Sequence, residues 1–382
     1  MPAAQIHGSC DPRFERVREA FAGNFAQHGE IGASLAVIAG GRTVVDLWGG
    51  HADAARTRAW ERDTLVNVFS VGKGVLALAM LMLVDRGLVD LDAPVCRYWP
   101  EFAAAGKEAI TVRQLLAHQA GLPAVREVLP DGAMYDWERM TSALAAQSPW
   151  WRPGTRHGYH VNTFGFLVGE VVRRTSGLKP GAFIRNEIAA PLDADFVIGV
   201  APRDDARVAE FVWLAELATV PEVDRTRIRD EELMQLHTYF NPRGASGHGT
   251  VNDTQWRRAD YPSTNGHATA LGIARIYGVV AAGGRAGMVS REALDEGARE
   301  HSVGIDAVLG RPSRFGLGFQ LAPLDKPIGP NPGVVLHFGA GGALGFADSV
   351  AGVAFGYAMN RMGPRYHNPT NRNLIGALYE CL

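Results

Sequence analysis

Strand-like segments lie at both ends of this chain and a long helical stretch separates them, which constrains the fold more than any other feature. β-rich runs cover residues 33–39, 43–48, 315–321, 334–338, 344–350 and 353–359. Helical spacing covers residues 12–28, 69–86, 111–116, 163–175, 182–188, 268–282 and a final stretch from Asn371. The economical arrangement is one antiparallel sheet built from both ends, covered by terminal helices, with a helical domain inserted. We therefore predict an α+β fold.

The change in pattern along the chain also predicts the domain boundaries. Residues 1–85 and 262–382 are expected to form an α/β domain around the sheet, and residues 86–261 a mostly helical domain. The segment after residue 200 is charged and aromatic with weak periodicity, and we interpret it as an elaborated surface region. An active site is expected between the two domains.

Composition excludes several classes of protein. With 47% hydrophobic and 20% charged residues among 382, the chain can bury a large core and is not disordered. Its 38 basic and 40 acidic residues contain no basic run, which argues against a nucleic-acid partner. The longest apolar run, 75–84, is about half of the roughly 20 residues needed to cross a bilayer. No secretory signal is readable at the start, so we expect a cytoplasmic protein without a membrane partner.

Ser70 and Lys73 form the first candidate catalytic pair. Only four of the 38 basic residues are lysines, and Lys73 is the one that begins an apolar helical run. Residues three apart share a helix face, so the Ser70 hydroxyl and the Lys73 amine can meet at the helix N-terminus. Arginine cannot release its proton in a protein, whereas a desolvated lysine can. An alternative interpretation is a helix-capping serine followed by a surface lysine.

Two further segments carry candidate residues. Tyr159 follows a turn just before a predicted helix, and its phenol would act as a base only if a cation such as Lys73 stabilised the anion. A packed aromatic is the alternative for Tyr159 alone. The sequence His337-Phe338-Gly339-Ala340 ends a predicted strand, where glycine allows close backbone approach to a substrate. Without other support, that strand end is a simple turn.

These three pieces, in this order, resemble the class C β-lactamase-like serine hydrolases and, within them, the family VIII carboxylesterases. The resemblance runs over nearly the whole chain. It also rests on matching segments at 87–94 (GLVDLDAP), 118–123 (HQAGLP) and 315–319 (FGLGF).

The resemblance implies a β-lactamase/DD-peptidase-like fold and a role for each candidate residue. Ser70 would be the acylated nucleophile, Lys73 its proton-transfer partner and Tyr159 the general base for attack and deacylation. The oxyanion hole would be formed by the backbone N–H groups of Ser70 and Ala340. His337, Phe338 and Gly339 occupy the place of the family's K-T-G strand motif and are expected at the substrate. Neither a metal nor an organic cofactor is implied.

Two departures from the lactamase pattern favour an esterase. The lactamases' Y-x-N motif is here Tyr159-His160-Val161, so an amide-binding Asn is replaced by an apolar residue at the substrate. Asn162 would point elsewhere if a helix has begun there. His337 replaces the K-T-G lysine and removes a cation that could attract a carboxylate. We therefore expect a carboxylesterase for small, mainly neutral esters, with weak β-lactamase activity at most.

Other interpretations stay open at this stage. The same acyl-enzyme could pass its acyl group to an alcohol or amine, which would make the protein an acyltransferase. A catalytically silent binding or scaffold protein of the same fold is the third possibility. His157 and His160 lack a third ligand, so no metal is assigned. The ester, its acyl-chain length and the oligomeric state are not readable from the sequence.

Overall fold

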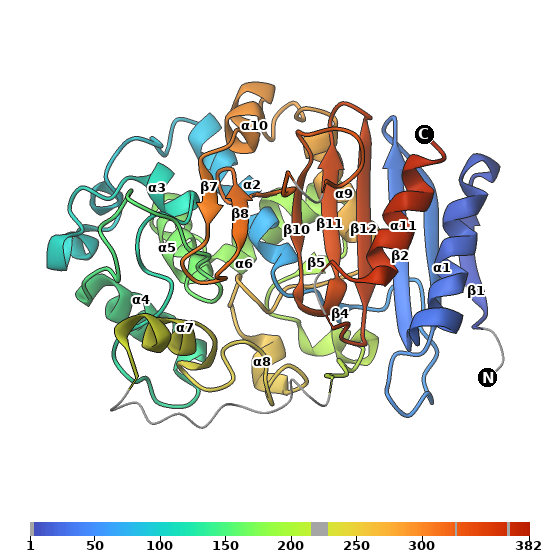
Figure 1. Ribbon diagram of the computed structural model, residues 1–382, viewed down its shortest axis with the longest axis horizontal. Helices are drawn as coiled ribbons and strands as arrows, with labels where there is room; N and C mark the ends of the chain where they lie inside the picture. The colour runs from blue at the N-terminus through green and yellow to red at the C-terminus, as the bar shows by residue number, and fades with distance from the viewer. Residues whose placement is uncertain (1–3, 215–227, 325–326, 365–366) are drawn as a thin grey trace.

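The two ends of the chain share one nine-stranded antiparallel sheet in the computed structural model, which describes residues 4–214, 228–324, 327–364 and 367–382. Its strand order is β1-β3-β2-β12-β11-β10-β9-β8-β7 (Figure 1). The strands are β1 (Ile6–Cys10), β2 (Gly32–Ala39), β3 (Arg42–Gly50), β7 (Ser302–Ile305), β8 (Pro312–Phe315), β9 (Gln320–Leu321), β10 (Val335–Phe338), β11 (Leu344–Asp348) and β12 (Val353–Met359). β12 pairs with β2 along its whole length, from Val353 opposite Ala39 to Met359 opposite Ala33. This pairing joins the C-terminal segment to the N-terminal one, as predicted.

A second, small sheet connects the middle of the chain to the rest. It has the order β4-β6-β5, with β4 (Val66–Asn67), β5 (Phe196–Val197) and β6 (His267–Ala268). β4 leads directly into the Ser70 segment, and β5 lies in the stretch predicted to be helical. The domain boundaries at residues 85/86 and 261/262 stay a prediction.

Helices occupy most of the middle of the chain and both of its ends. In the described residues they are α1 (Glu15–His28), α2 (Val71–Asp85), α3 (Val112–Leu116), α4 (Trp137–Ala146), α5 (Phe164–Ser176), α6 (Pro180–Phe183), α7 (Asp230–Phe240), α8 (Thr254–Arg258), α9 (Ala270–Ala281), α10 (Arg291–Ala298) and α11 (Pro369–Tyr379). Thr111 and Gln114 form the capping box that the sequence predicts before α3. The fold is therefore mixed helix and antiparallel sheet, as expected.

Helices cover both faces of the sheet. The side chains of each strand alternate between these faces, so a central strand contacts helices on both sides. On one face, Gly345 lies so close to α9 that a Cβ there would be 2.4 Å from the Tyr277 ring. On the other face, Phe346 stacks on Tyr379 of α11, with ring centroids 6.4 Å apart. α11 packs along α1 (Figure 1). The central strands are consequently buried on both sides.

The central helix α2 is buried from Val71 to Leu83 without interruption. It packs against α5, α10 and β10, which explains why its sequence is apolar all round rather than on one face. Across the described residues, none of the helices combines the length and the apolarity needed to cross a bilayer. α2 thus lies between β10 of the sheet and α5 of the helical region, and Ser70 stands at its N-terminus.

Candidate active site

Ser70 and Lys73 meet at the N-terminus of α2, as their spacing predicts. The Lys73 Nζ lies 2.9 Å from the Ser70 Oγ. The same amine donates a 2.8 Å hydrogen bond to the Ser263 carbonyl. Lys73 is fully buried and Ser70 is 9% exposed. The alternative of a surface lysine behind a capping serine is therefore excluded, since Ser70 makes no side-chain capping bond either.

Two glycines allow the Ser263 carbonyl to reach Lys73. A Cβ on Gly72 would lie 3.0 Å from the Pro262 carbonyl oxygen, and one on Gly165 would lie 2.5 Å from the Ser263 nitrogen. Both positions therefore need the absence of a side chain for the 262–263 segment to approach α2 and α5. Ser263 was not predicted as a site residue, because its backbone makes the contact and no side-chain pattern reports it.

The residue before Ser70 has a strained backbone. Phe69 has φ 48°, in the left-handed region that a bulky side chain rarely adopts. Such a conformation costs about 1–3 kcal/mol and persists only where packing compensates for it. The Phe69 ring makes edge contacts with Phe211 and Trp213, at centroid distances of 4.9 and 5.9 Å. This packing holds the sharp turn from which Ser70 projects.

Tyr159 lies beside Lys73 and Ser70 although it comes from a different segment of the chain. Its backbone N–H donates to both carboxylate oxygens of Asp306, at 3.0 and 3.1 Å. Its ring stacks on Phe315 at 5.6 Å, with an angle of 8° between the planes. The Lys73 Nζ lies 5.0 Å from the centroid of that ring, and Tyr159 lines the same cavity as Ser70. Ser70, Lys73 and Tyr159 thus form one contiguous cluster.

Burial sets the protonation of the two partners of Ser70. Desolvation lowers the pKa of Lys73 well below its usual value. Desolvation also raises the pKa of Tyr159 above its usual value, and the nearby Ser70 side chain only partly opposes this. Stabilisation of the Tyr159 anion by Lys73 stays a prediction, because desolvation is the largest influence on the phenol. Burial thus favours the neutral form of both the amine and the phenol.

The two residues expected to form an oxyanion hole, Ser70 and Ala340, line the same cavity. Within the described part of the chain, the N–H groups of Ser70 and Ala340 donate to no protein acceptor. Gly339 brings the end of β10 against the segment before α2: a Cβ there would lie 2.3 Å from the Val68 carbonyl oxygen. Glycine at 339 thus places the Ala340 N–H next to the start of α2. Two backbone donors without a protein acceptor at one cavity suit a developing oxyanion.

A cavity of about 200 Å³ opens above Ser70. Its lining is formed by Ser70, Tyr159, Val161, Tyr239, Leu309, Arg311, Phe315, Gln320, Phe338, Gly339 and Ala340. Val161, Phe338 and Gly339, which were expected at the substrate, are among these lining residues. His337 does not line the cavity, which corrects the expectation that it faces the substrate. Successive residues of a strand point to opposite sides, so His337 turns inward beside Tyr159, with ring centroids 5.9 Å apart.

The segment at 118–123 holds the Tyr159 turn in place. His118 has φ 60°, and its carbonyl accepts the Gly158 N–H at 3.1 Å. Its Nδ1 accepts the His160 N–H at 3.2 Å. The His160 Nε2 in turn accepts the Leu122 N–H at 3.0 Å. These imidazoles have backbone partners, which is a structural role and not a metal-binding one.

Asn162 points away from the cavity, but not because a helix has begun. Its amide donates to the Thr238 carbonyl at 2.7 Å and to the Ser246 Oγ at 2.9 Å. α5 starts only at Phe164. Val161 consequently lines the cavity at the position of the motif's amide side chain.

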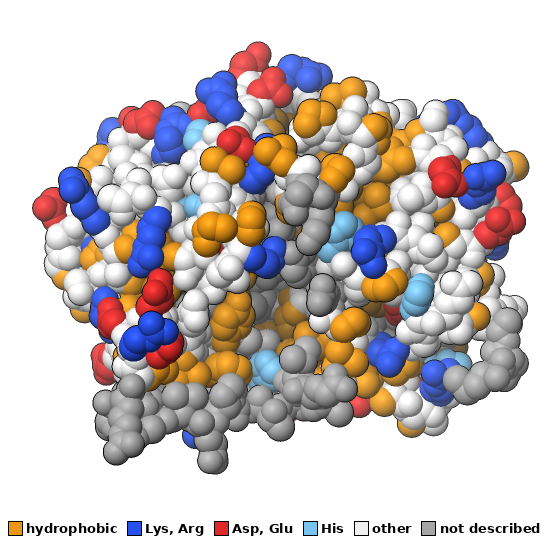
Figure 2. Space-filling model, viewed as in Figure 1, with side chains coloured by type: hydrophobic (Ala, Val, Ile, Leu, Met, Phe, Trp, Pro, Cys, Tyr) orange, Lys and Arg blue, Asp and Glu red, His pale blue; other side chains and the backbone are white. Residues whose placement is uncertain are grey.

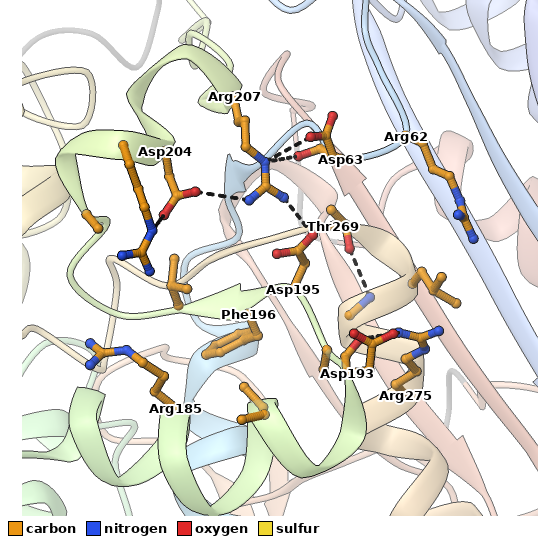
Figure 3. Close-up of a pocket in the computed structure, with 18 of the residues that line it drawn as sticks. Arg62, Asp63, Arg185, Asp193, Asp195, Phe196, Asp204, Arg207, Thr269 and Arg275 are labelled. Atoms are coloured by element: carbon orange, nitrogen blue, oxygen red, sulfur yellow. Dashed lines mark hydrogen bonds and ion pairs between the residues drawn. The ribbon is translucent and has the colours of Figure 1, made fainter.

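A second, polar cavity of about 720 Å³ lies apart from these residues (Figure 3). Its charged side chains are largely paired with one another: Arg207 contacts Asp63, Asp195 and Asp204, and Arg275 contacts Asp193 (Figure 3). It contains none of the predicted site residues. In the described part of the chain, no group of three His, Cys, Asp or Glu side chains could hold a metal ion. The chemistry therefore centres on the smaller cavity.

Comparison with known proteins places the chain among similar sequences and folds. The β-lactamase family model matches residues 17–379. The chain is 36% identical over 366 residues to the esterase/beta-lactamase LipL of Mycobacterium tuberculosis, which covers 94% of this chain and 83% of LipL. A solved family VIII carboxylesterase superposes with TM-score 0.91 at 40% identity, over 99% of this chain and all of that one. A penicillin-binding protein homologue from Caulobacter crescentus superposes with TM-score 0.90 at 36% identity, over 99% and 100% of the two chains.

Proposed function

Since this chain belongs to the β-lactamase family and is a serine hydrolase, we propose that it is a carboxylesterase that hydrolyses small, mainly neutral esters through an acyl-enzyme on Ser70. The observation that carries the proposal is the contact of the Ser70 Oγ with the fully buried Lys73 amine, 2.9 Å away at a helix N-terminus, where burial favours the neutral form of the amine. A neutral amine has the lone pair that a charged ammonium lacks, so it can accept the serine proton. The similarity to an esterase and to a family VIII carboxylesterase supports the same reaction.

In acylation, Ser70 Oγ attacks the ester carbonyl while its proton passes to the Lys73 Nζ. The negative charge that develops on the carbonyl oxygen is stabilised by the Ser70 and Ala340 N–H groups. As the C–O bond to the alcohol breaks, the neutral phenol of Tyr159 protonates the leaving alkoxide. Lys73 then returns its proton to Tyr159, so both groups end the step neutral. In this proposal Lys73 is the base and Tyr159 is the acid of the step, and the burial of both groups supports these roles.

Deacylation uses the same groups, with water as the nucleophile that attacks the acyl-enzyme. The Lys73–Tyr159 pair accepts a proton from the attacking water, the tetrahedral intermediate forms in the same oxyanion hole, and its collapse returns a proton to Ser70 Oγ. An alcohol bound in place of water would give acyl transfer, so hydrolysis and transfer share every protein group. Only the acceptor differs.

The cavity suits esters with small, mainly neutral groups. Most of its wall is apolar or aromatic, including Val161, Leu309, Phe315 and Phe338, and Arg311 is the one charged residue among the lining residues that the structure describes. His337, in the place of the K-T-G lysine, is buried beside the cavity, and desolvation lowers its pKa to about 3, so it supplies no positive charge near neutral pH. On the face shown in Figure 2, basic and acidic side chains are intermixed, which provides no field of one sign to steer a charged ester.

The test is steady-state release of nitrophenol from p-nitrophenyl acetate, butyrate and octanoate by wild type and Ser70→Ala, with a chromogenic cephalosporin in parallel. We expect turnover of the short esters by wild type, none by Ser70→Ala, and a much slower reaction with the cephalosporin. Added butanol distinguishes transfer from hydrolysis, because transfer produces the butyl ester. Full activity of Ser70→Ala would refute the proposed nucleophile.

A further inference from the structure

A buried carboxylate that the reaction does not use lies directly behind Tyr159. Asp306 is fully buried. Its Oδ1 accepts the backbone N–H groups of Tyr159 at 3.0 Å, Val308 at 2.9 Å and Leu309 at 2.9 Å. Its Oδ2 accepts the Tyr159 N–H at 3.1 Å and the Ser313 hydroxyl at 2.9 Å. A buried charge with this many donors is stabilised where it stands and resists displacement.

The hydrogen-bond chain continues to His157. The His157 Nε2 lies 2.8 Å from the Ser313 Oγ. Because the single Ser313 hydrogen is donated to Asp306, the Oγ can only accept from His157, which requires the tautomer with hydrogen on Nε2. Desolvation lowers the pKa of His157, which keeps the imidazole neutral. The His157 carbonyl also accepts the Ala307 N–H at 3.0 Å, so the two segments are joined on both sides of the carboxylate.

The residue types are those of a hydrolase triad, but the geometry is not. Here serine lies between histidine and aspartate, whereas a nucleophilic serine must donate to the histidine. Ser313 is 3% exposed and donates its hydrogen to a carboxylate. This cluster is therefore not a second nucleophilic site. Its function must come from the backbone groups that its hydrogen bonds hold in place.

We propose that Asp306 is a positioning residue for catalysis, which sets the Tyr159 phenol against Ser70 and, through the same carboxylate, holds the Leu309 wall of the cavity. This inference rests on the proposed function. Asp306 contacts the backbone of Tyr159 rather than its phenol. It therefore fixes the position of the acid and takes no proton itself. Leu309 lines the cavity, and its N–H shares the Oδ1 atom with Tyr159. One buried group thus couples the proton donor to the substrate wall.

The expected magnitude follows from the sensitivity of proton transfer to distance. A misplacement of a catalytic group by about 1 Å can cost about 10²-fold in rate. Asp306→Asn keeps the size of the side chain, but its amide nitrogen cannot accept from Ser313 or Tyr159. We therefore expect kcat for p-nitrophenyl butyrate to fall about 10²-fold, with KM changed less than about threefold.

Asp348 provides a matched control. Its side chain is 1% exposed, and its Oδ1 accepts the N–H groups of Val350 and Ala351 at 3.0 and 2.9 Å. Its Oδ2 accepts from Asn331 and Tyr379, both at 2.8 Å. The environment repeats that of Asp306 except for the contact with Tyr159. Asp348→Asn should therefore lower the thermal midpoint to a similar extent and leave kcat unchanged.

A double-mutant cycle separates positioning from a general structural effect. If Asp306 acts through Tyr159, Asp306→Asn should reduce kcat in wild type but have little further effect in Tyr159→Phe. The rate of Ser70 labelling by diethyl p-nitrophenyl phosphate, followed as a burst of nitrophenol, should fall in parallel with kcat. Equal losses of kcat in Asp306→Asn and Asp348→Asn, or the same loss with and without the Tyr159 phenol, would overturn the proposal.

A milder variant keeps the test decisive if Asp306→Asn does not fold. Ser313→Ala removes one donor to the carboxylate and leaves its four backbone contacts, and we expect it to fold and to lower kcat about tenfold. A folded Ser313→Ala with wild-type kcat and labelling rate would then reject the inference. The Ser70→Ala result tests the proposed function separately: if that variant is inactive and Asp306→Asn is not impaired, only the positioning role fails.

Discussion

Replacing Gly339 by alanine tests the oxyanion hole by steric means alone. Gly339 has φ −91° and ψ 160°, a conformation that alanine adopts readily, so the substitution brings no backbone strain. The new Cβ would lie 2.3 Å from the Val68 carbonyl oxygen. Favourable contacts need about 3.5 Å, so the end of β10 must move about 1 Å away from the segment before α2. The Ala340 N–H moves with it.

The consequence for catalysis is the weakening or loss of one oxyanion donor. Loss of such a donor costs about 10²–10³-fold in kcat, whereas overpacking alone costs about 1–3 kcal/mol of stability. We expect Gly339→Ala to fold, to release nitrophenol from p-nitrophenyl butyrate about 10²-fold more slowly, and to keep KM within a factor of a few. Gly333→Ala is the control, because a Cβ there meets nothing within 4 Å. A folded Gly339→Ala enzyme with wild-type kcat would refute the placement of Ala340 in the oxyanion hole.

Three further predictions address selectivity, protonation and stability. Val161→Asn should return an amide to the cavity wall and raise the kcat/KM for a chromogenic cephalosporin by up to about tenfold relative to the butyrate ester, measured on the same preparation. Because burial lowers the pKa of Lys73, the pre-steady-state acylation rate should increase with pH as the amine loses its proton, and Lys73→Arg should lose activity at every pH, since its guanidinium stays charged. Burial raises the pKa of Glu30 to about 7, above its unfolded value, so stability contributed by the protonated acid is lost as pH rises through 7. Glu30→Gln should therefore be the more stable protein at pH 8, by up to about 3 kcal/mol in urea unfolding, and a wild type that is equally stable at that pH would contradict this.

The elements that were predicted correctly are those whose signal is strong within their own segment. The central strands and α2 are apolar because they are buried on every side. The β-rich runs at 33–39 and 43–48 form the adjacent, paired strands β2 and β3. The two edge strands, β1 and β7, were not predicted. Most of their residues are exposed, so no regular apolar pattern marks them. They become strands because a neighbouring strand offers hydrogen bonds.

The site shows the same division between near and distant contacts. Ser70 and Lys73 are three residues apart, so helix geometry alone brings them together. Ser263 contacts Lys73 across 190 residues, and Asp306 contacts Tyr159 across 147. Both contacts involve backbone groups, which every residue possesses, so no residue type in the sequence identifies them. His337 was placed wrongly because the period of a strand tells which residues alternate, but not which face meets the cavity.

The sequence by itself determined the antiparallel sheet shared by the two chain ends and the helix turn that joins the nucleophile to its amine, because both follow from local periodicity and spacing. Only the tertiary structure decided that burial lowers the pKa of Lys73 and raises that of Tyr159. The pKa of a side chain depends on how much water its surroundings remove, and those surroundings come from segments far apart in the chain. For the same reason, the proposed assignment of Lys73 as base and Tyr159 as acid rests on burial, which the motif alone does not contain.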